Sequence, residues 1–443
     1  MILSLLRECH NNKDRIGVIH AALQNVVQLA SWDVSDLSCL LTTVVDIALP
    51  SPSPSSSSSS SLDVELSLLA LRLINSLVSE SYTVLESHHL FHHITQILDR
   101  MAYLFEHLSS HTEPKEAAIQ CSHFLGSMLQ LDDEATQSKI EKLFPKFVSL
   151  GLKYLESASN EFLGIYILQT CLSSKYFGTI SNSTTAPLRV QCLQILESAY
   201  LQADVAKLLA ISLQQGTTEL WLAHWKAFTD ECFNCLVMLG IIDGPLLVTE
   251  PTIDLQAVKL RIGKLAGWSK AQLVSSLHAG LLYVLTHLLE VGNCNGYMAI
   301  NIGSYISYNT SLLSYTINMS SSSSTYLIAN KQHITPASLR LLLPTMKIQC
   351  LQLLSLLLRT FNGGLARYGS SLCKLIATAL ALHKDTDLPV LLAALDTFSL
   401  AMALFPSLIL QVCCIDLLLL FTFPLISSSL HAEMYFPLFF IFI

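Results

Sequence analysis

The sequence predicts an all-α protein, an irregular HEAT/armadillo-like solenoid built from right-handed helical hairpins. Hydrophobic residues make up 51% of the 443 residues and charged residues only 13%, whereas ordinary soluble domains carry about 25% charged residues. The hydrophobic residues recur at helical spacing from Ile2 to about Phe405 and do not collect in one long run. Helices of this composition pack against neighbours on more than one side, as they do in stacked helical repeats.

The predicted helices follow one another along almost the whole chain. Leu188, Cys192 and Ile195 show the pattern, because they form an apolar stripe at positions i, i+4 and i+7. The predicted segments are Arg15–Ala30, Ser35–Ala48, Leu62–Ser79, Val84–Ser109, Lys115–Leu129, Glu134–Leu155, Glu161–Leu172, Pro187–Leu201, Ala203–Gln214, Glu219–Leu239, Lys270–Glu290, Ser338–Phe361, Leu365–Leu382 and Asp387–Phe405. They pair at intervals of roughly 35–45 residues, the length of HEAT and armadillo units. The sequence shows no comparable strand pattern.

The predicted organisation has six parts. Two low-complexity tracts, Pro50–Ser61 and Ser320–Ser324, predict loops, because a repetitive polar sequence does not form a packed core. The parts are an N-terminal helical hairpin (1–49), a disordered Ser/Pro-rich loop (50–61), a helical-repeat solenoid (62–291), a flexible insertion rich in Ser, Asn and Tyr with one weak helix (292–335), further solenoid repeats (336–405) and an apolar, atypical terminus (406–443).

The apolar terminus allows three interpretations: an atypical or misread end, a membrane anchor, or a native buried helix. Ser407–Ile426 has about the length that a helix needs to span a bilayer. Pro406, Pro424, Asp416 and the absence of Lys and Arg after Lys384 argue against an anchor. We therefore expect an atypical end, and membrane attachment is not expected.

Charge and cysteine usage narrow the function classes. The net charge is −8 with 25 Lys and Arg, and no basic run occurs, so direct sequence-specific nucleic-acid binding is not expected. The 12 cysteines are scattered along the chain, which is typical of a reduced, intracellular compartment.

One histidine cluster is a candidate metal site in the sequence. His88, His89, His92 and His93 form the string HHLFHH. On one helix, His88 and His92 would be four residues apart, as would His89 and His93, and this spacing can hold a metal ion. No Cys partner or HExxH motif accompanies them, so a solvated or interface histidine face is the alternative. The sequence contains no phosphate-binding, nucleophile-elbow or dinucleotide-binding motif, and we expect no catalytic residues, no cofactor and no enzymatic activity.

Two further patterns are candidates for partner binding. Trp221 and Trp225 share one helix face, where they could form an exposed aromatic anchor or part of the core. Leu339, Leu342 and Leu343 form an LxxLL string, which can dock as a short helix in a hydrophobic groove. In a chain this rich in leucine, core patterning is the alternative. The pair Cys232 and Cys235 forms a lone CxxC in an apolar stretch and is expected in the core.

Two blocks of the sequence carry a family resemblance. Pro187–Gly240 contains a helix, a short linker, a tryptophan-bearing helix and a stop at a small residue. Ser338–Gly369 contains a Leu-rich lead-in with Pro344, a helix and a Leu-Ala-Arg-Tyr-Gly close. In this order the two blocks, about a fifth of the chain, resemble the N-terminal helical region of the proline-, glutamate- and leucine-rich nucleolar protein family, the Rix-type pre-ribosomal RNA processing family.

The resemblance implies a non-enzymatic scaffold in the nucleus, mostly the nucleolus, that acts in maturation of the large ribosomal subunit. Its implied partners are a WD-repeat protein and other helical-repeat subunits of a pre-ribosomal complex. Related members also act as transcriptional coregulators through LxxLL strings. The family's acidic Pro/Glu-rich tail has no counterpart in this sequence. The alternative functions are a generic armadillo-type adaptor, for example cytoplasmic and in transport or in genome maintenance, and a helical protein anchored by its C-terminal segment.

Overall fold

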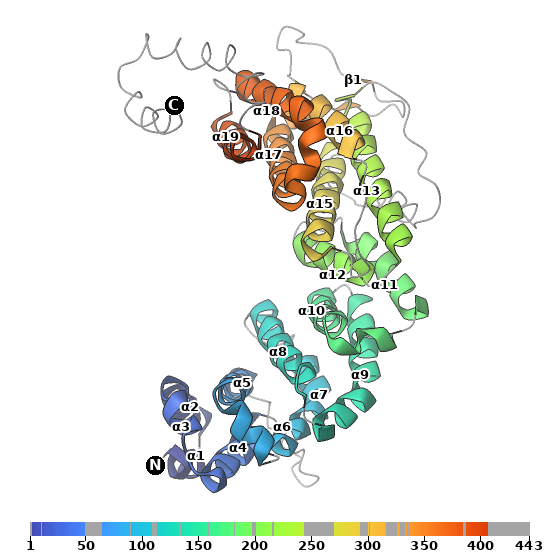
Figure 1. The fold of residues 1–443 in the computed structure, drawn as a ribbon. Helices are drawn as coiled ribbons and strands as arrows, with labels where there is room; N and C mark the ends of the chain where they lie inside the picture. Colours follow the sequence, from blue (N-terminus) through green and yellow to red (C-terminus); the bar gives the residue numbers. More distant parts are fainter. Residues whose placement is uncertain are drawn as a thin grey trace. The chain divides into compact units, whose positions relative to one another are not determined.

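The computed structural model describes residues 2–48, 64–242, 270–315 and 336–405, apart from short gaps within these ranges, and the pairs 326–327 and 333–334. The regular structure of the described residues is almost entirely α-helical (Figure 1), which confirms the predicted all-α class. Besides two short 3-10 helices, the described residues form a two-residue antiparallel ladder, in which β1 (Tyr326–Leu327) pairs with β2 (His333–Ile334). The predicted loops Pro50–Ser61 and Ser320–Ser324 and the terminus 406–443 lie outside the described residues.

The chain divides into two compact units, Met1–Gln191 and Cys192–Ile443. The helices of the first unit are α1 (Ile2–Glu8), α2 (Asn12–Gln24), α3 (Val26–Ala30), α4 (Val34–Ala48), α5 (Val64–Ser87), α6 (Phe91–Leu98), α7 (Met101–His107), α8 (Pro114–Leu129), α9 (Glu134–Leu155), α10 (Glu161–Leu172) and the 3-10 helix η2 (Lys175–Thr179). The division falls within α11 (Asn182–Ile195).

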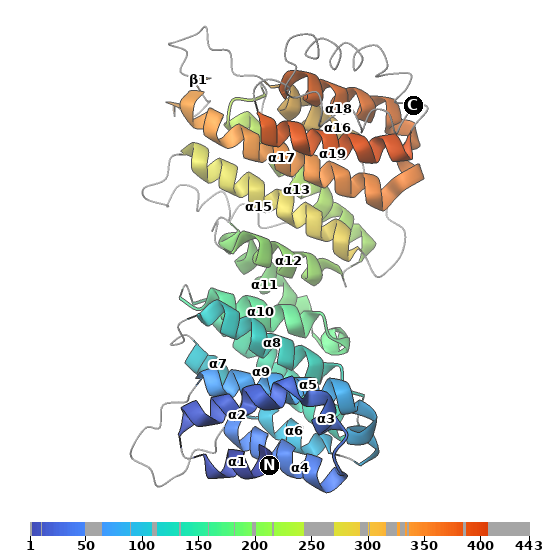
Figure 2. The same ribbon diagram turned by 90° about the vertical axis from the view of Figure 1, so that its left-hand side faces the viewer.

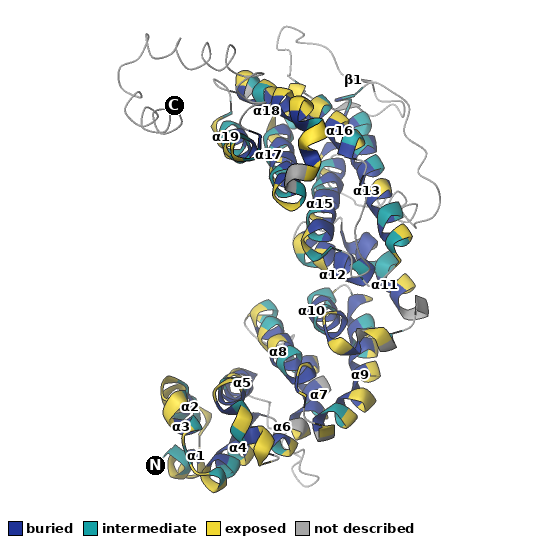
Figure 3. Cartoon of the chain, in the orientation of Figure 1, coloured by how far each residue is buried: buried dark blue, intermediate teal, exposed yellow. Residues whose placement is uncertain are grey.

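The helices of the first unit pack in two layers. In one layer α2 and α3 contact α5, α5 contacts α8, and α8 contacts α10; in the other, α1 contacts α4, α4 contacts α6, and α6 contacts α9. The layers meet where α4 packs on α5 and α9 packs on α10 (Figure 1). Buried side chains follow these contacts, while the outward sides of the helices are exposed (Figure 3).

The second unit repeats this scheme. Its elements are α12 (Gln202–Gln214), α13 (Thr218–Met238), α15 (Lys270–Val291), α16 (Ile302–Ser314), α17 (Pro336–Phe361), the 3-10 helix η3 (Asn362–Tyr368), α18 (Gly369–His383) and α19 (Leu388–Leu404). One layer runs in the order α12, α15, α17, α19, and the other in the order α13, α16, α18 (Figure 2). The layers meet between α13 and α15, α16 and α17, and α18 and α19.

Local sequence explains where helices begin and end. Asn11 caps α2, because its side chain accepts a hydrogen bond of 2.7 Å from the backbone N–H of Asp14. Thr217 caps α13 in the same way, accepting from the N–H of Leu220 at 3.2 Å. Gly240 follows α13 at a φ of 70°, a left-handed conformation that glycine adopts without a steric penalty and that ends many helices.

The predicted helix Val84–Ser109 is wrong, because the chain there forms the end of α5, then α6 and α7. Leu85 and Leu90 are both buried, but five residues place them about 140° apart on a continuous helix. The chain therefore has to turn between them, and the N–H of Leu90 donates to the carbonyl of Leu85 at 2.9 Å in this turn.

Two other predicted helices are also interrupted. Arg15–Ala30 breaks at Asn25, whose φ of −116° and ψ of 24° are not helical. The start of Leu365–Leu382 is the 3-10 helix η3, which contains the helix-weakening pair Gly363 and Gly364. The predicted flexible insertion 292–335 contains α16, and Tyr305, Tyr308 and Asn309 on this helix are buried. This part of the insertion is therefore part of the packed core.

Three described helices are long and apolar enough to cross a membrane by length and composition: Val64–Ser87, Ala271–Val291 and Ser338–Phe361. In each of these helices, half or more of the most apolar stretch is buried inside the fold. Packing in the core therefore accounts for at least half of each apolar stretch.

Candidate functional site

The structure does not place the clustered histidines on one helix. His88 lies in the turn after α5, His92 and His93 lie in α6, and His89 lies outside the described residues. Nε2 of His93 is 3.0 Å from Oγ of Ser38, and its Nδ1 is 3.2 Å from Oγ1 of Thr42. Within the described part of the chain, no group of three or more His, Cys, Asp or Glu side chains could hold a metal ion. The predicted i, i+4 spacing of His88 and His92 on one helix is therefore absent, because the turn at Leu90 separates His88 from α6.

His93 instead connects α6 to α4. Burial lowers the pKa of His93 from its ordinary value, and the neighbouring His92 lowers this pKa further. We expect His93→Ala to reduce the free energy of unfolding by about 1 kcal/mol, because two hydrogen bonds between the helices are lost. His92 is exposed, so His92→Ala is the matched control and should change stability little. Urea unfolding of both variants measures the difference, and equal effects would contradict a connecting role for His93.

The tryptophan pair is in the core, which contradicts its candidacy as an exposed anchor. Trp221 is fully buried and Trp225 is 3% exposed. Their rings stack with centroids 5.7 Å apart and planes 6° apart. Neither indole N–H has a hydrogen-bond partner among the described residues. The physical reason is that α13 is buried on most of its circumference, since it contacts helices of both layers.

The LxxLL string on α17 is not available as a docking face. Leu339 and Leu343 are buried and Leu342 is partly exposed. The exposed residue in this turn is Leu341, at 82%, which is not one of the motif leucines. The leucine pattern therefore follows the core contacts of α17.

The CxxC cysteines are core residues, as the sequence predicted. Cys232 and Cys235 on α13 are both buried. Burial raises the pKa of the Cys232 thiol well above its usual value, and the nearby groups of Cys235, Cys350 and Glu231 raise it further. A thiol held in its protonated form is a poor nucleophile and a poor metal ligand.

A buried polar network in the second unit is the most distinctive group of side chains in the described structure. His278 on α15 is fully buried, and its Nε2 is hydrogen-bonded to Oη of Tyr308 on α16. Oη of Tyr308 lies 3.1 Å from Sγ of Cys350 on α17. Oη of Tyr305 donates to the carbonyl of Cys350 at 3.3 Å. The network therefore joins three consecutive helices, α15, α16 and α17.

The direction of the hydrogen bonds follows from the unpaired atom. Nδ1 of His278 has no hydrogen-bond partner among the described residues, and a buried N–H without a partner is rare. We therefore place the ring proton of His278 on Nε2, which leaves Nδ1 without a hydrogen. In this arrangement Nε2–H of His278 donates to Oη of Tyr308, and the hydroxyl of Tyr308 donates to Sγ of Cys350.

Every member of this network is held uncharged. Burial lowers the pKa of His278 to about 3 and raises the pKa of Cys350 to about 12, against a smaller opposing effect of the hydrogen bond from Tyr308. Burial also raises the pKa values of Tyr305 and Tyr308 well above the ordinary range. A neutral, fully buried group of side chains of this kind offers no activated nucleophile or base. Its hydrogen bonds instead hold α15, α16 and α17 in one specific arrangement in the core.

Sequence reasoning missed this network, although a signal was present. His278 lies on the apolar stripe of α15, at the i+4 position from Val274 and three residues before Leu281. A polar residue on a stripe that is otherwise apolar indicates a buried partner, but the sequence does not show that this partner is Tyr308.

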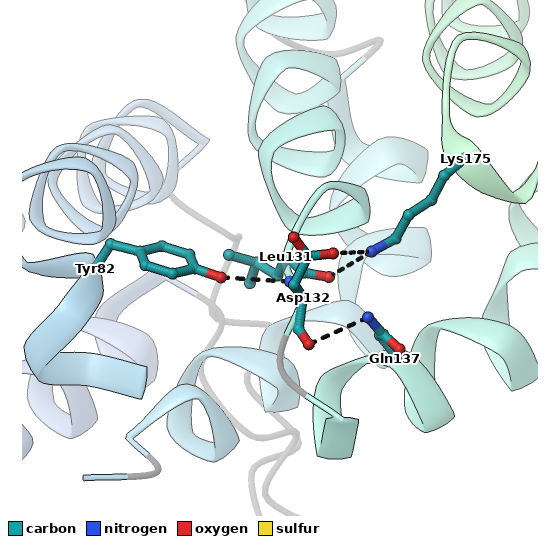
Figure 4. A network of polar contacts seen from close by, with 5 residues as sticks. All are labelled: Tyr82, Leu131, Asp132, Gln137 and Lys175. Carbon is teal, nitrogen blue, oxygen red and sulfur yellow. Dashed lines mark hydrogen bonds and ion pairs between the residues drawn. The ribbon is translucent and has the colours of Figure 1, made fainter. Parts of the chain in front are cut away.

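A second connection surrounds Asp132 in the first unit (Figure 4). Nζ of Lys175 donates to the carbonyl of Leu131 at 2.9 Å and to Oδ1 of Asp132 at 2.7 Å. Nε2 of Gln137 donates to the carbonyl of Asp132 at 3.2 Å, and the N–H of Asp132 donates to Oη of Tyr82 at 3.5 Å. The turn between α8 and α9 is thereby tied to α5, α9 and η2. The Asp132 side chain is 76% exposed, so its ion pair with Lys175 contributes little to stability.

The comparisons with known proteins give no family for this chain. No known family model matches its sequence, and no curated protein matches it.

Proposed function

We propose that the chain is a helical-repeat scaffold of the HEAT/armadillo kind, and that it binds other proteins without catalysing a reaction. The observation that carries the proposal is the packing order within each unit, where each helix of a layer contacts the next helix of the same layer. Successive helical hairpins stack in this way in repeat proteins, which use their extended surfaces for binding. The neutral, buried state of the His278 network also favours a structural role over a catalytic one.

We propose further that the scaffold acts in assembly of the large ribosomal subunit, in the nucleus and mainly the nucleolus. The support is the resemblance of two blocks to the Rix-type family. In the structure, Pro187–Gly240 includes the end of α11, then α12, α13 and the turn at Gly240, and Ser338–Gly369 includes most of α17 and η3. The proposed partners are a WD-repeat protein and helical-repeat subunits of a pre-ribosomal complex.

Affinity purification of the tagged full-length chain, followed by mass spectrometry, tests this function. We expect large-subunit precursors and a WD-repeat protein among the captured proteins, and nucleolar fluorescence of the tagged chain. The matched bait is Leu341→Asp, which changes an exposed leucine and should leave the fold intact. A pull-down without ribosomal precursors would overturn the ribosome assignment and leave a generic adaptor, and cytoplasmic fluorescence would support that alternative.

A further inference from the structure

Helix α9 in the first unit presents a row of lysines on its exposed side. The lysines of this helix are Lys139, Lys142, Lys146 and Lys153. On an α-helix these four positions lie within about 60° of one another around the axis and extend over about 21 Å. Lys142, Lys146 and Lys153 are exposed, while Phe144 lies on the opposite, buried side of α9 (Figure 3). We call the four residues the lysine stripe.

The described structure leaves most of this positive charge without a partner. Nζ of Lys139 pairs with Oδ2 of Asp99 at 2.7 Å, but no acidic side chain among the described residues forms an ion pair with the other three lysines. Glu141 lies about 100° around the helix from Lys142, outside the stripe. Lys142 and Lys146 are four residues apart, and like charges at this spacing repel each other and destabilise a helix. The free protein therefore has an unfavourable charge arrangement on this surface.

We propose that the lysine stripe docks a short acidic segment of a partner protein, about as long as the stripe itself. Carboxylates of such a segment would pair with the three unpaired lysines and remove their mutual repulsion. The whole chain has 33 Asp and Glu against 25 Lys and Arg, so a surface with an excess of lysines differs in sign from the chain as a whole. The inference rests on the proposed scaffold role and names the chemistry of one partner.

A nucleic acid fits this surface less well than an acidic peptide does. Duplex DNA carries one negative charge per about 1.7 Å of its axis, and the charges continue along its whole length. Beyond the stripe, such a polyanion would meet a chain whose net charge is −8. Charges that are exposed and more than about 8 Å apart are largely screened at physiological ionic strength. A short acidic segment confined to the stripe is therefore attracted by the lysines with little repulsion from the rest of the chain.

Fluorescence anisotropy with the purified full-length chain tests the proposal. The probe is a fluorescein-labelled oligoglutamate peptide that matches the stripe in length. We expect the wild type to bind this peptide, and the triple variant Lys142→Gln, Lys146→Gln and Lys153→Gln to bind it roughly tenfold or more weakly, because three exposed ion pairs are lost. Added salt should also weaken binding by the wild type, because exposed charges are screened.

A second triple variant is the matched control. Lys13→Gln, Lys207→Gln and Lys374→Gln remove the same charge from exposed positions on α2, α12 and α18. This variant should bind the peptide as the wild type does, and both triple variants should keep the melting temperature of the wild type.

Three results would overturn the proposal. The first is no binding of the peptide by the wild type, which would leave the lysine stripe as a solvated surface. The second is equal weakening in the two triple variants, which would show an effect of net charge alone. The third is tighter binding of an oligouridine of the same length, lost in the stripe variant, which would assign the surface to a nucleic acid. All three are measured with purified components, so they are distinct from a pull-down without ribosomal precursors.

Discussion

Gly164→Ala is expected to lower the free energy of unfolding of the first unit by about 1–3 kcal/mol or more, because it overpacks a helix contact. Gly164 lies on α10, where this helix packs on α9. A Cβ atom at this position would lie 2.5 Å from the backbone N of Leu155 and 2.6 Å from the carbonyl oxygen of Gly151. Backbone atoms cannot rotate away as a side chain can, so the two helices would have to separate.

Gly17→Ala is the matched control for this prediction. Gly17 lies within α2, and a Cβ there would meet no heavy atom within 4 Å. Alanine has a higher helix propensity than glycine, so Gly17→Ala should stabilise the protein by roughly 0.5–1 kcal/mol. Urea unfolding followed by circular dichroism measures both variants. A stabilising effect of Gly164→Ala would show that α9 and α10 are not in close backbone contact.

The sequence predicts helices best where the buried residues of a segment fit one straight helix. Glu134–Leu155 and Glu161–Leu172 were predicted with the same bounds that α9 and α10 have in the structure. The prediction fails between Leu85 and Leu90, where the buried side of the chain changes within five residues. A helical pattern on either side of such a change looks continuous in the sequence, although the backbone has to turn.

The candidate site was less predictable than the fold, because exposure depends on neighbours that are distant in sequence. Trp221 is buried and Leu341 is exposed, yet both lie in helices with apolar residues on several sides. Sequence periodicity identifies which residues share a helix face, and tertiary packing decides which of these faces are covered. Tyr308, the partner of His278, lies 30 residues further along the chain, and Cys350, the partner of Tyr308, lies 72 residues further. Only the packing of α15, α16 and α17 brings these three residues together.

His278 is expected to make the second unit sensitive to acid. The ordinary pKa of histidine is 6.5, and burial lowers the pKa of His278 to about 3 in the folded chain. The unfolded chain therefore binds a proton below about pH 6.5 that the folded chain does not bind, so stability falls as the pH falls. This single group should cost about 2.5 kcal/mol between pH 7.5 and pH 4.5, and about 4–5 kcal/mol once the pH reaches the folded pKa.

His278→Leu removes the titrating group and keeps a side chain of similar size, while Tyr308 retains its contact with Cys350. At pH 7.5 we expect this variant to be less stable than the wild type by about 1–2 kcal/mol, because Tyr308 loses one hydrogen bond.

The difference in stability between the wild type and His278→Leu should shrink as the pH falls and reverse its sign near pH 5, because only the wild type carries the proton-linked penalty. Urea unfolding at a series of pH values measures this crossing, followed by tryptophan fluorescence, to which Trp221 and Trp225 in the same unit contribute. His287→Leu is the control on the same helix, since His287 is partly exposed and pairs with Glu290 at 2.7 Å. This variant retains His278, so its stability should fall with falling pH as that of the wild type does. Parallel pH curves for the wild type and His278→Leu would show that His278 is protonated in the folded chain and that the network is not sealed from water.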